Sequence, residues 1–277
     1  MTVQIVLCDS ADHVGVRAAD IIEARVRQGP AVLGLATGGS PRSTYQELIR
    51  RHREEQLSFS QVTGFTLDEY AGLPKDHEQS YYSTIRREFV DHVDLPLERL
   101  FTPQGDAPDL VAEAERYDAA IAAAGGVDIQ ILGIGANGHI GFNEPTSSLA
   151  SRTRVKTLAG ATRTDNARFF PDGDVPRLCL TQGLGTIREA KLAVLVAMGG
   201  NKAAAVQAMV EGPVSANCPA SVLQLHRRAV ILLDPAAASR LSMLEYYREA
   251  QEFNDQLGQT PTRPWLQEPA AGEFLSR

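Results

Sequence analysis

The chain has 277 residues, of which 43% are hydrophobic and 22% charged, a composition typical of a globular protein and not of a disordered one. Its formal net charge is −7, which argues against a nucleic-acid-binding protein, because such proteins usually carry a basic excess. An anionic small substrate is still compatible with this charge, since a few local cations can dominate one cleft.

The cysteines and the N-terminus bear on the compartment. Cys8, Cys179 and Cys218 form an odd, scattered set without the spacing of a disulfide framework or a zinc site. Residues 1–6 lack the basic region of a signal peptide, and the longest apolar run, 192–198, is far shorter than the roughly 20 residues of a membrane span. We therefore expect a cytoplasmic protein.

Short apolar runs rich in Val, Ile and Leu alternate with helical patterns along the chain. The runs are nearly continuous, which is typical of strands buried on both faces of a parallel sheet. In chain order we expect strand 4–8, helix 11–27, strand 31–36, helix 41–53, strand 64–67, helix 109–124, strand 128–134, strand 191–198, helix 201–210, strand 229–233 and helix 235–253. This order predicts an α/β fold, a three-layer, doubly wound and mostly parallel sheet.

Two long segments, 72–80 and 142–185, lack clear periodicity. Loops of that length in a compact domain are usually functional, and many are lids. We expect one domain over residues 1–254 with a helical or loop lid at about 146–185. A proline-containing tail, 255–277, follows it.

A glycine turn follows the second predicted strand, in the sequence Thr37-Gly38-Gly39-Ser40-Pro41. Ligands of such sheets bind beyond the carboxyl ends of the strands. Ser40 suits a helix N-cap, Pro41 suits the first helical position, and the two glycines let backbone N–H groups approach an anion. The turn lacks the Gly-Lys-Ser/Thr ending of a P-loop. It is either a phosphate-binding loop or a plain capped turn.

A second glycine turn, 133–138, matches the dinucleotide pattern G-x-G-x-x-G only superficially. Pro145 follows quickly, and residues 151–158 contain no acidic residue to hold a ribose, so NAD binding is disfavoured. The turn is more consistent with the presentation of a group of polar side chains: Asn137, His139, Asn143 and Glu144.

His139 and Asp68 are the candidate acid–base groups. Histidine has an ordinary pKa of about 6.5 and can give or take protons at neutral pH. Asp68 ends the predicted strand 64–67, and with Glu69 pointing the other way it would be a general base; the alternative is a surface acid pair. The spacing of His139 and Glu144 is not that of a helical zinc motif, so we expect no metal.

Taken together, these segments resemble the glucosamine-6-phosphate deaminase family from about residue 4 to residue 250. The matching segments are Leu35-Ala-Thr-Gly-Gly-Ser-Pro41, Leu67-Asp-Glu-Tyr-Ala-Gly-Leu73, Ser80-Tyr-Tyr, Gly133-Ile-Gly-Ala-Asn-Gly-His-Ile-Gly-Phe-Asn-Glu-Pro145, Ser147-Ser-Leu-Ala-Ser-Arg-Thr-Arg154, Leu180-Thr, 199–202 and Ser221-Val-Leu-Gln-Leu-His226.

The resemblance implies a modified Rossmann-like fold that converts glucosamine 6-phosphate and water to fructose 6-phosphate and ammonia, without metal or redox cofactor. It implies that Asp68 carries the proton from C2 to C1. It also implies that His139 serves ring opening with the help of Glu144 and Asn137. The substrate phosphate would be held by Thr37, Gly38, Gly39, Ser40, Arg168 and Lys202. Some family members have aspartate at position 137, so the asparagine bears on the pH optimum.

Hexameric, allosteric members of the family bind N-acetylglucosamine 6-phosphate between subunits. The resemblance places that effector on Ser147, Arg154, Lys156 and Tyr246, and it favours a homo-oligomer, a hexamer first. The alternative is that these are surface residues of a monomer or dimer.

Three other functions compete with the deaminase. A 6-phosphogluconolactonase shares a Gly-His turn but lacks the continuation of residues 142–145 seen here. A sugar-phosphate sensor would have lost Asp68, His139 or Glu144, and all three are present. A deaminase for galactosamine 6-phosphate remains open, because a few loop contacts would read the C4 epimer.

Overall fold

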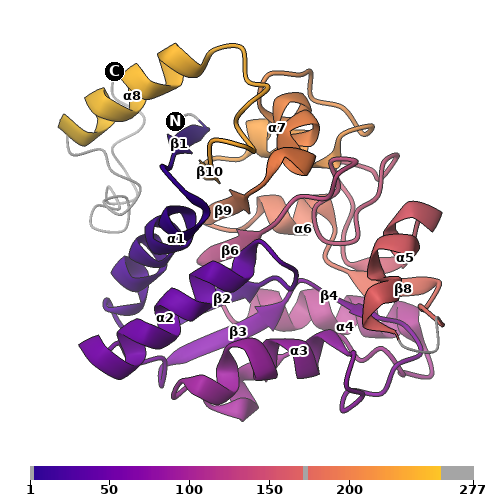
Figure 1. Ribbon diagram of the computed structural model, residues 1–277. Coiled ribbons are helices and arrows are strands. Elements are labelled where there is room, and N and C mark those ends of the chain that lie inside the picture. The colour runs from indigo at the N-terminus through magenta and orange to yellow at the C-terminus, as the bar shows by residue number, and fades with distance from the viewer. Residues whose placement is uncertain (1–2, 171–173, 257–277) are drawn as a thin grey trace, which may run out of the picture.

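The computed structural model describes residues 3–170 and 174–256, and there it forms a central sheet of seven parallel strands between two layers of helices (Figure 1). From edge to edge the strands are β1 (Gln4–Leu7), β10 (Ala229–Leu233), β9 (Leu192–Ala197), β6 (Ile129–Leu132), β2 (Ala31–Leu35), β3 (Val62–Thr66) and β5 (Leu100–Phe101). Neighbouring strands run parallel in every pair. The α/β, three-layer, doubly wound fold predicted from the sequence is confirmed.

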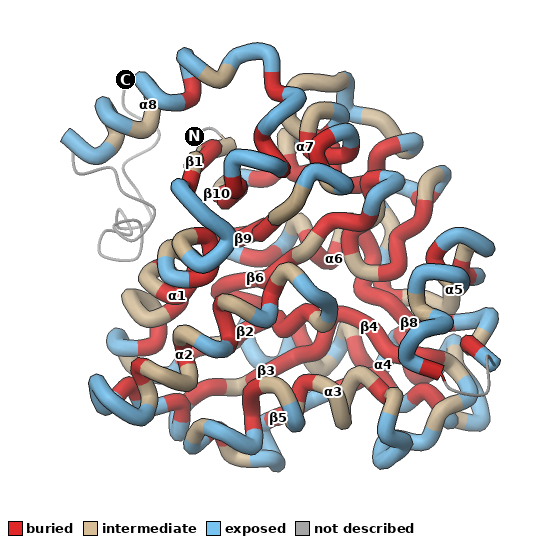
Figure 2. The backbone as a smooth tube through the Cα atoms, viewed as in Figure 1, coloured by how far each residue is buried: buried red, intermediate tan, exposed pale blue. Residues whose placement is uncertain are grey.

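Each central strand is buried on both faces, so the tube through the sheet is almost continuously in the buried colour (Figure 2). Within β9, Val194 and Val196 contribute to the core on one face, whereas Ala193, Leu195 and Ala197 contribute to the core on the other. This alternation follows from the two-residue period of a strand. It explains why the sequence of β9 is apolar at every position.

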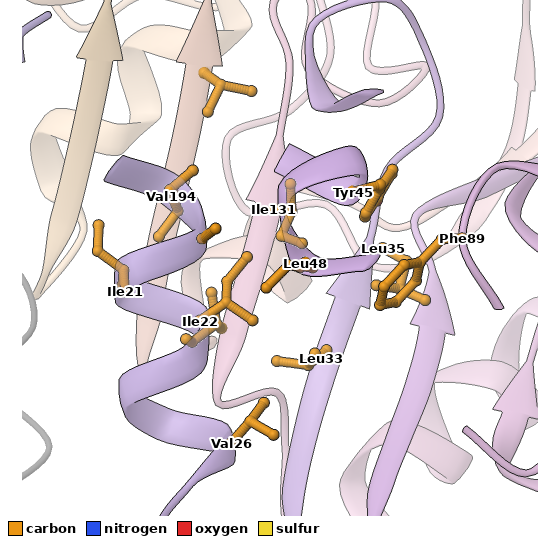
Figure 3. Close-up of a cluster of buried hydrophobic side chains, with 14 of the residues drawn as sticks. Ile21, Ile22, Val26, Leu33, Leu35, Tyr45, Leu48, Phe89, Ile131 and Val194 are labelled. Atoms are coloured by element: carbon orange, nitrogen blue, oxygen red, sulfur yellow. The ribbon is translucent and has the colours of Figure 1, made fainter. Parts of the chain in front are cut away.

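Helices cover both faces of the sheet. The first face carries α1 (Ala11–Val26), α2 (Pro41–Glu55) and α3 (Tyr81–Glu88). Figure 3 shows Ile22 of α1 and Leu48 of α2 packed toward Leu33, Ile131 and Val194 of the strands. The second face carries α4 (Leu110–Ala123), α6 (Leu184–Arg188), α7 (Ala203–Val210) and α8 (Leu244–Gln256). No helix among the described residues is both long and apolar enough to cross a bilayer.

A second, antiparallel sheet lies beside the first and has the order β4 (Asp68–Tyr70), β8 (Leu178–Thr181) and β7 (Arg154–Thr157). With α5 (Gly160–Asn166), these strands give regular structure to much of the segment 142–185, which the sequence left without elements. An aromatic cluster that includes Tyr70, Phe142 and Phe170 packs between them. Short 3₁₀ turns complete the chain: Val90–His92, Leu97–Arg99, Ala167–Phe169, Gly200–Lys202 and Pro219–Leu225.

The last helix begins later than predicted, at Leu244 rather than at residue 235. The Glu211 carboxylate accepts hydrogen bonds from the backbone N–H groups of Ser242 (2.9 Å) and Met243 (3.0 Å), just before the helix. A carboxylate at this point satisfies N–H groups that have no partner within the helix. The prediction failed because this partner comes from a distant part of the chain. Most of the predicted tail, 257–277, lies outside the described residues.

Arg51 joins α1 to α2. Its guanidinium is buried and bonds to Asp20 (2.7 Å) and Glu23 (2.6 Å) of α1 and to Glu47 (2.8 Å) of its own helix. We expect the Arg51→Ala substitution to lower the free energy of unfolding by about 3 kcal/mol, because the carboxylates of the two helices lose the buried cation that they share. Urea denaturation measures this change. The exposed Arg53→Ala control should cost less than about 0.5 kcal/mol, and an equal cost for both variants would contradict the prediction.

Candidate active site

A cavity of about 740 Å³ opens at the carboxyl ends of β2, β3, β6 and β9. This is the edge of the sheet where ligands bind in folds of this type. Most of the residues that the sequence singled out line it: Thr37, Gly38, Gly39, Ser40, Asp68, His139, Arg168 and Lys202. Of the predicted catalytic residues, Asn137 and Glu144 lie behind His139 rather than on the cavity wall.

Asp68 lies where the chain passes from the central sheet to the second sheet. The N–H of Leu67 still donates to the β2 carbonyl of Leu35 (2.8 Å), and the next residue, Asp68, already pairs with Thr181 of β8. The Asp68 side chain is 5% exposed, and no donor among the described residues hydrogen-bonds to its carboxylate. Burial, and then the charge of Glu69, raise its pKa well above the ordinary value. A buried carboxylate that lines a cavity without a partner fits a general base.

Glu69 turns away from the cavity, as expected from the sequence. Its carboxylate accepts the backbone N–H groups of Tyr70 (2.8 Å), Tyr81 (2.9 Å) and Tyr82 (3.0 Å). Two of these groups belong to the first turn of α3, where a carboxylate complements the helix dipole. Burial raises the pKa of Glu69 to about 7, although the three N–H groups oppose the rise. Glu69 therefore anchors α3, and Asp68 is the acid available to a ligand.

His139, Asn137 and Glu144 form a hydrogen-bonded relay. His139 Nδ1 lies 2.7 Å from Asn137 Oδ1, and Asn137 Nδ2 donates to Glu144 Oε2 at 2.8 Å. Because the amide oxygen can only accept, Nδ1 carries the proton and Nε2 keeps a lone pair. Burial lowers the pKa of His139, and the charge of Lys202 lowers it further, against the opposing charge of Glu144. The ring is therefore neutral near pH 7 and able to accept a proton.

Gly135 makes room for that ring. A Cβ at position 135 would lie 2.2 Å from His139 Cε1 and 2.4 Å from both ring nitrogens. The glycine turn that resembled a dinucleotide pattern thus serves the packing of the histidine. Of the four side chains that the turn was expected to present, His139 lines the cavity, Asn137 and Glu144 lie behind it, and Asn143 is buried.

The segment that was expected to form a lid contacts the relay through Glu144. Its Oε1 accepts a hydrogen bond from the hydroxyl of Thr162, in α5, and another from the N–H of Ala159 (3.3 Å). No sequence pattern pointed to Thr162, because its contact with Glu144 depends on how α5 packs against the relay. Opening of α5 would remove these donors from Glu144.

The glycine loop is open to the cavity. Gly38 has a φ of 110°, which favours glycine, and a Cβ at Gly38 or Gly39 would meet no atom within 4 Å. Pro41 opens α2 as predicted. The predicted N-cap role of Ser40 is wrong: its backbone is helical and its side chain makes no capping bond. The loop is held from behind, where the buried hydroxyl of Tyr45 donates to the carbonyl of Ala36 (2.8 Å).

Two cationic side chains, Lys202 and Arg168, line the same cavity as the glycine loop. Lys202 ends the 3₁₀ turn after β9, and burial followed by the charge of Arg168 lowers its pKa, with Asp165 opposing. Arg168 lies over the ring of Phe169, 4.7 Å from its centroid. An anion beside the loop would find backbone N–H groups, a helix N-terminus and two positive charges.

Tyr70, Tyr81 and Asn166 also line the cavity, although no sequence pattern assigned them a role. The hydroxyl of Tyr81 donates to that of Tyr70 (3.3 Å), which also accepts from Asn166 Nδ2 (2.9 Å). The Ser80-Tyr-Tyr segment was the sequence feature that could have pointed to Tyr81 as a site residue. These rings form an aromatic wall beside Asp68.

The four predicted effector residues lie outside the cavity. Ser147 is buried and donates to the carbonyl of Glu144 (2.7 Å), and Arg154 Nη1 donates to Asn143 Oδ1 (2.9 Å). Lys156 follows on β7, which pairs with β8. Tyr246 is exposed on α8, on the opposite side of the molecule from β8 (Figure 1). Within one chain, Tyr246 is therefore not brought to the other three.

The chain is similar to several known proteins. A family model described as glucosamine-6-phosphate isomerases/6-phosphogluconolactonase matches residues 8–232. A glucosamine-6-phosphate deaminase of Rhodococcus jostii is 59% identical over 250 residues, 90% of this chain and 96% of the relative. One from Cellvibrio japonicus is 51% identical over 261 residues, 92% of this chain and 99% of that relative.

Two solved structures have a similar fold. One described as a monomeric glucosamine-6-phosphate deaminase is 45% identical, has a TM-score of 0.84, and overlaps 86% of this chain and 99% of its own. A 6-phosphogluconolactonase of Trypanosoma cruzi has a TM-score of 0.71 at 19% identity, over 87% of this chain and 98% of its own, and it supports the fold alone.

Proposed function

Because the chain belongs to the glucosamine-6-phosphate isomerase/6-phosphogluconolactonase family, we propose that it is a deaminase that converts glucosamine 6-phosphate and water to fructose 6-phosphate and ammonia. One observation carries the proposal. The carboxylate of Asp68, to which no described residue donates a hydrogen bond, lines the same cavity as the glycine loop and as His139, whose relay leaves Nε2 able to accept a proton. A lactonase needs no carboxylate to move a carbon-bound proton, so this arrangement favours the deaminase.

The first step is opening of the sugar ring. A base must take the proton of the anomeric hydroxyl, and the ring oxygen must receive one. His139 Nε2 takes the first proton, Asn137 and Glu144 hold the imidazolium that forms, and the same proton then passes to the ring oxygen. The product is the open-chain aldehyde, with C1 as a carbonyl.

The second step moves hydrogen between carbons. The carbonyl at C1 makes the C2 proton acidic, and the Asp68 carboxylate removes it to give an enol-like intermediate. The same group, now a carboxylic acid, returns the proton to C1 and leaves an imine at C2. Water adds to this imine, and ammonia leaves as the C2 carbonyl of fructose 6-phosphate forms.

The phosphate end of the sugar orients these steps. The loop from Thr37 to Ser40, with Arg168 and Lys202, would bind the dianion, so that binding energy far from the reacting carbons holds C1 and C2 in place. An acidic chain can therefore bind an anionic sugar, since the local field is set by these groups.

The test is to incubate the protein separately with glucosamine 6-phosphate, galactosamine 6-phosphate and 6-phosphogluconolactone. We expect ammonia and fructose 6-phosphate from the first substrate. Binding without turnover would favour a sensor, hydrolysis of the lactone alone would favour a lactonase, and faster release of ammonia from the galactose epimer would change the substrate.

Position 137 should set the titration of His139. In the Asn137→Asp variant a carboxylate would face Nδ1 and stabilise the imidazolium, so we expect the pKa of His139 to rise from its lowered value. The acidic limb of kcat/KM then moves to higher pH, because protonated Nε2 cannot accept the anomeric proton. NMR titration of the ring measures the shift, with the exposed His92 as internal reference. An unchanged or lowered pKa would contradict the prediction.

A homo-oligomer, with a hexamer first, and an effector site form a separate part of the proposal. The buried Nη2 atom of Arg154 has no hydrogen-bond partner among the described residues, which would suit an anion at Ser147, Arg154, Lys156 and a neighbouring Tyr246. A monomeric relative favours the alternative of a chain that acts alone.

The kinetics decide between these alternatives. We expect velocity against substrate to be sigmoidal and to become hyperbolic with N-acetylglucosamine 6-phosphate, with light scattering giving the assembly size. Hyperbolic curves that the compound leaves unchanged, from a monomer, would contradict the proposed effector site.

The cytoplasm remains the proposed compartment, because Cys8, Cys179 and Cys218 are buried free thiols, as in reducing environments.

A further inference from the structure

A second large cavity, of about 1030 Å³, lies at the opposite ends of the central strands from the candidate active site. Asp128, Lys191 and Arg228 line it, and each immediately precedes a strand, β6, β9 or β10. Because these strands are parallel, the cavity is at their amino ends. None of the residues discussed for the deaminase reaction lines it.

The lining is strongly cationic. Two carboxylates, those of Asp128 and Glu189, face six positive side chains: Arg25, Arg152, Arg188, Lys191, Arg227 and Arg228. The whole chain has a net charge of −7, so this excess is local. A concave surface of one sign focuses the field and attracts ions of the other sign.

Part of this charge is neutralised within the fold. The buried carboxylate of Asp128 is shared between Arg25 (2.8 Å) and Lys191 (2.9 Å), so one negative charge serves two positive ones. Arg152 bonds to Asp118 (2.9 Å) and Glu189 (2.6 Å). These ion pairs form part of the cavity wall, and the lining as a whole keeps a net positive charge.

Arg188 and Arg227 have no such partner. Among the described residues, no carboxylate lies within salt-bridge distance of either guanidinium. Burial lowers the pKa of the nearby His226 ring, hydrogen bonds with the backbone of Arg228 and Ala190 oppose this, and the charges of Arg188 and Arg227 lower it further. His226 is 5% exposed, and its Nδ1 accepts a hydrogen bond from the backbone N–H of Arg228 (2.9 Å). Arg188 and Arg227 therefore line the same cavity, and both contribute to the positive field around it.

We propose that this cavity binds an organic or inorganic polyphosphate, with Arg188 and Arg227 as its principal ligands. The planar guanidinium matches pairs of phosphate oxygens, and several arginines together suit a ligand with several negative charges. The hollow shape suits a small molecule rather than a flat macromolecular surface. The site is independent of the deaminase chemistry.

Calorimetry of the full chain at an ionic strength of about 0.15 M tests the site with two probes, inorganic tripolyphosphate and ATP. We expect saturable binding of tripolyphosphate, and the Arg188→Gln/Arg227→Gln double variant should weaken it by at least about tenfold. The Arg53→Gln/Arg240→Gln variant, which removes the same charge from exposed sites elsewhere, should bind as the unmodified chain does. Tighter binding of ATP would identify a nucleotide, and equal binding would identify the polyphosphate group alone.

Location is checked by two further measurements. In an NMR titration, saturating tripolyphosphate should raise the pKa of His226, since an anion opposes the field of the two arginines. If Lys202→Met abolishes binding and the Arg188→Gln/Arg227→Gln variant does not, the probe occupies the active-site cavity and the proposal is overturned. The absence of saturable binding, or equal weakening in both double variants, overturns it too.

Discussion

Replacing Asp68 with asparagine is expected to lower kcat/KM for glucosamine 6-phosphate by about 10²- to 10⁴-fold while leaving the fold intact. Asparagine fills nearly the same volume and cannot accept the C2 proton. Because no described donor binds the Asp68 carboxylate, the substitution removes no hydrogen bond that stabilises the protein. The loss should therefore be in the chemistry.

The same substitution should stabilise the protein at neutral pH. The pKa of Asp68 is raised in the folded chain, so the folded state binds this proton more tightly than the unfolded state. The free energy of unfolding of the wild type therefore falls as pH rises from the ordinary aspartate pKa of about 3.9 through the raised value. Asparagine lacks this dependence, and urea denaturation above that window should find the variant at least as stable.

Two measurements distinguish the step that depends on Asp68 from the step that depends on His139. In D₂O, wild-type enzyme should exchange the C2 hydrogen of the substrate, and the Asp68→Asn variant should not. Interconversion of the α and β anomers depends on ring opening by His139 and should persist in the variant. Retained C2 exchange would show that another group is the base.

The sequence predicted six of the seven strands of the central sheet, because their apolar runs are nearly continuous, as in β9 and β10. The two-residue strand β5 was missed, because it is too short to form such a run. The second sheet escaped prediction for a different reason. β7 reads Arg-Val-Lys-Thr, a short and mostly polar strand that forms only because β8 supplies its partners from over twenty residues further along. The late start of α8 has a similar cause, since Glu211 sets it from a different helix end.

The same contrast between local patterns and distant partners applies to the residues of the candidate site. Asp68, His139 and Glu144 could be placed from their positions after predicted strands, and the relay from Asn137 to Glu144 lies within one short continuous segment. Thr162 could not be placed, because it meets Glu144 only through the docking of α5. The wrong N-cap at Ser40 came from local statistics, which the loop geometry overrides.

Gly135 tests whether the orientation of His139, and not merely its presence, controls ring opening. We expect the Gly135→Ala substitution to lower kcat/KM by about 10²-fold, because a misplacement of about 1 Å can cost that much. The added Cβ would lie 2.2 Å from the ring, and the displaced ring would lose its 2.7 Å bond to Asn137. Steady-state kinetics measure the loss, and anomer interconversion should slow in parallel.

Gly133→Ala is the matched control within the same turn. Its Cβ would meet Pro41 Cδ at 3.7 Å and Ser40 Cβ at 3.9 Å, which are ordinary contacts, and neither glycine has a positive φ. Both variants change the backbone entropy of the unfolded chain alike, so their stabilities should differ only by the clash. Activity of Gly135→Ala equal to that of Gly133→Ala would mean that the histidine tolerates displacement. Ring opening would then depend on another proton acceptor in the cavity.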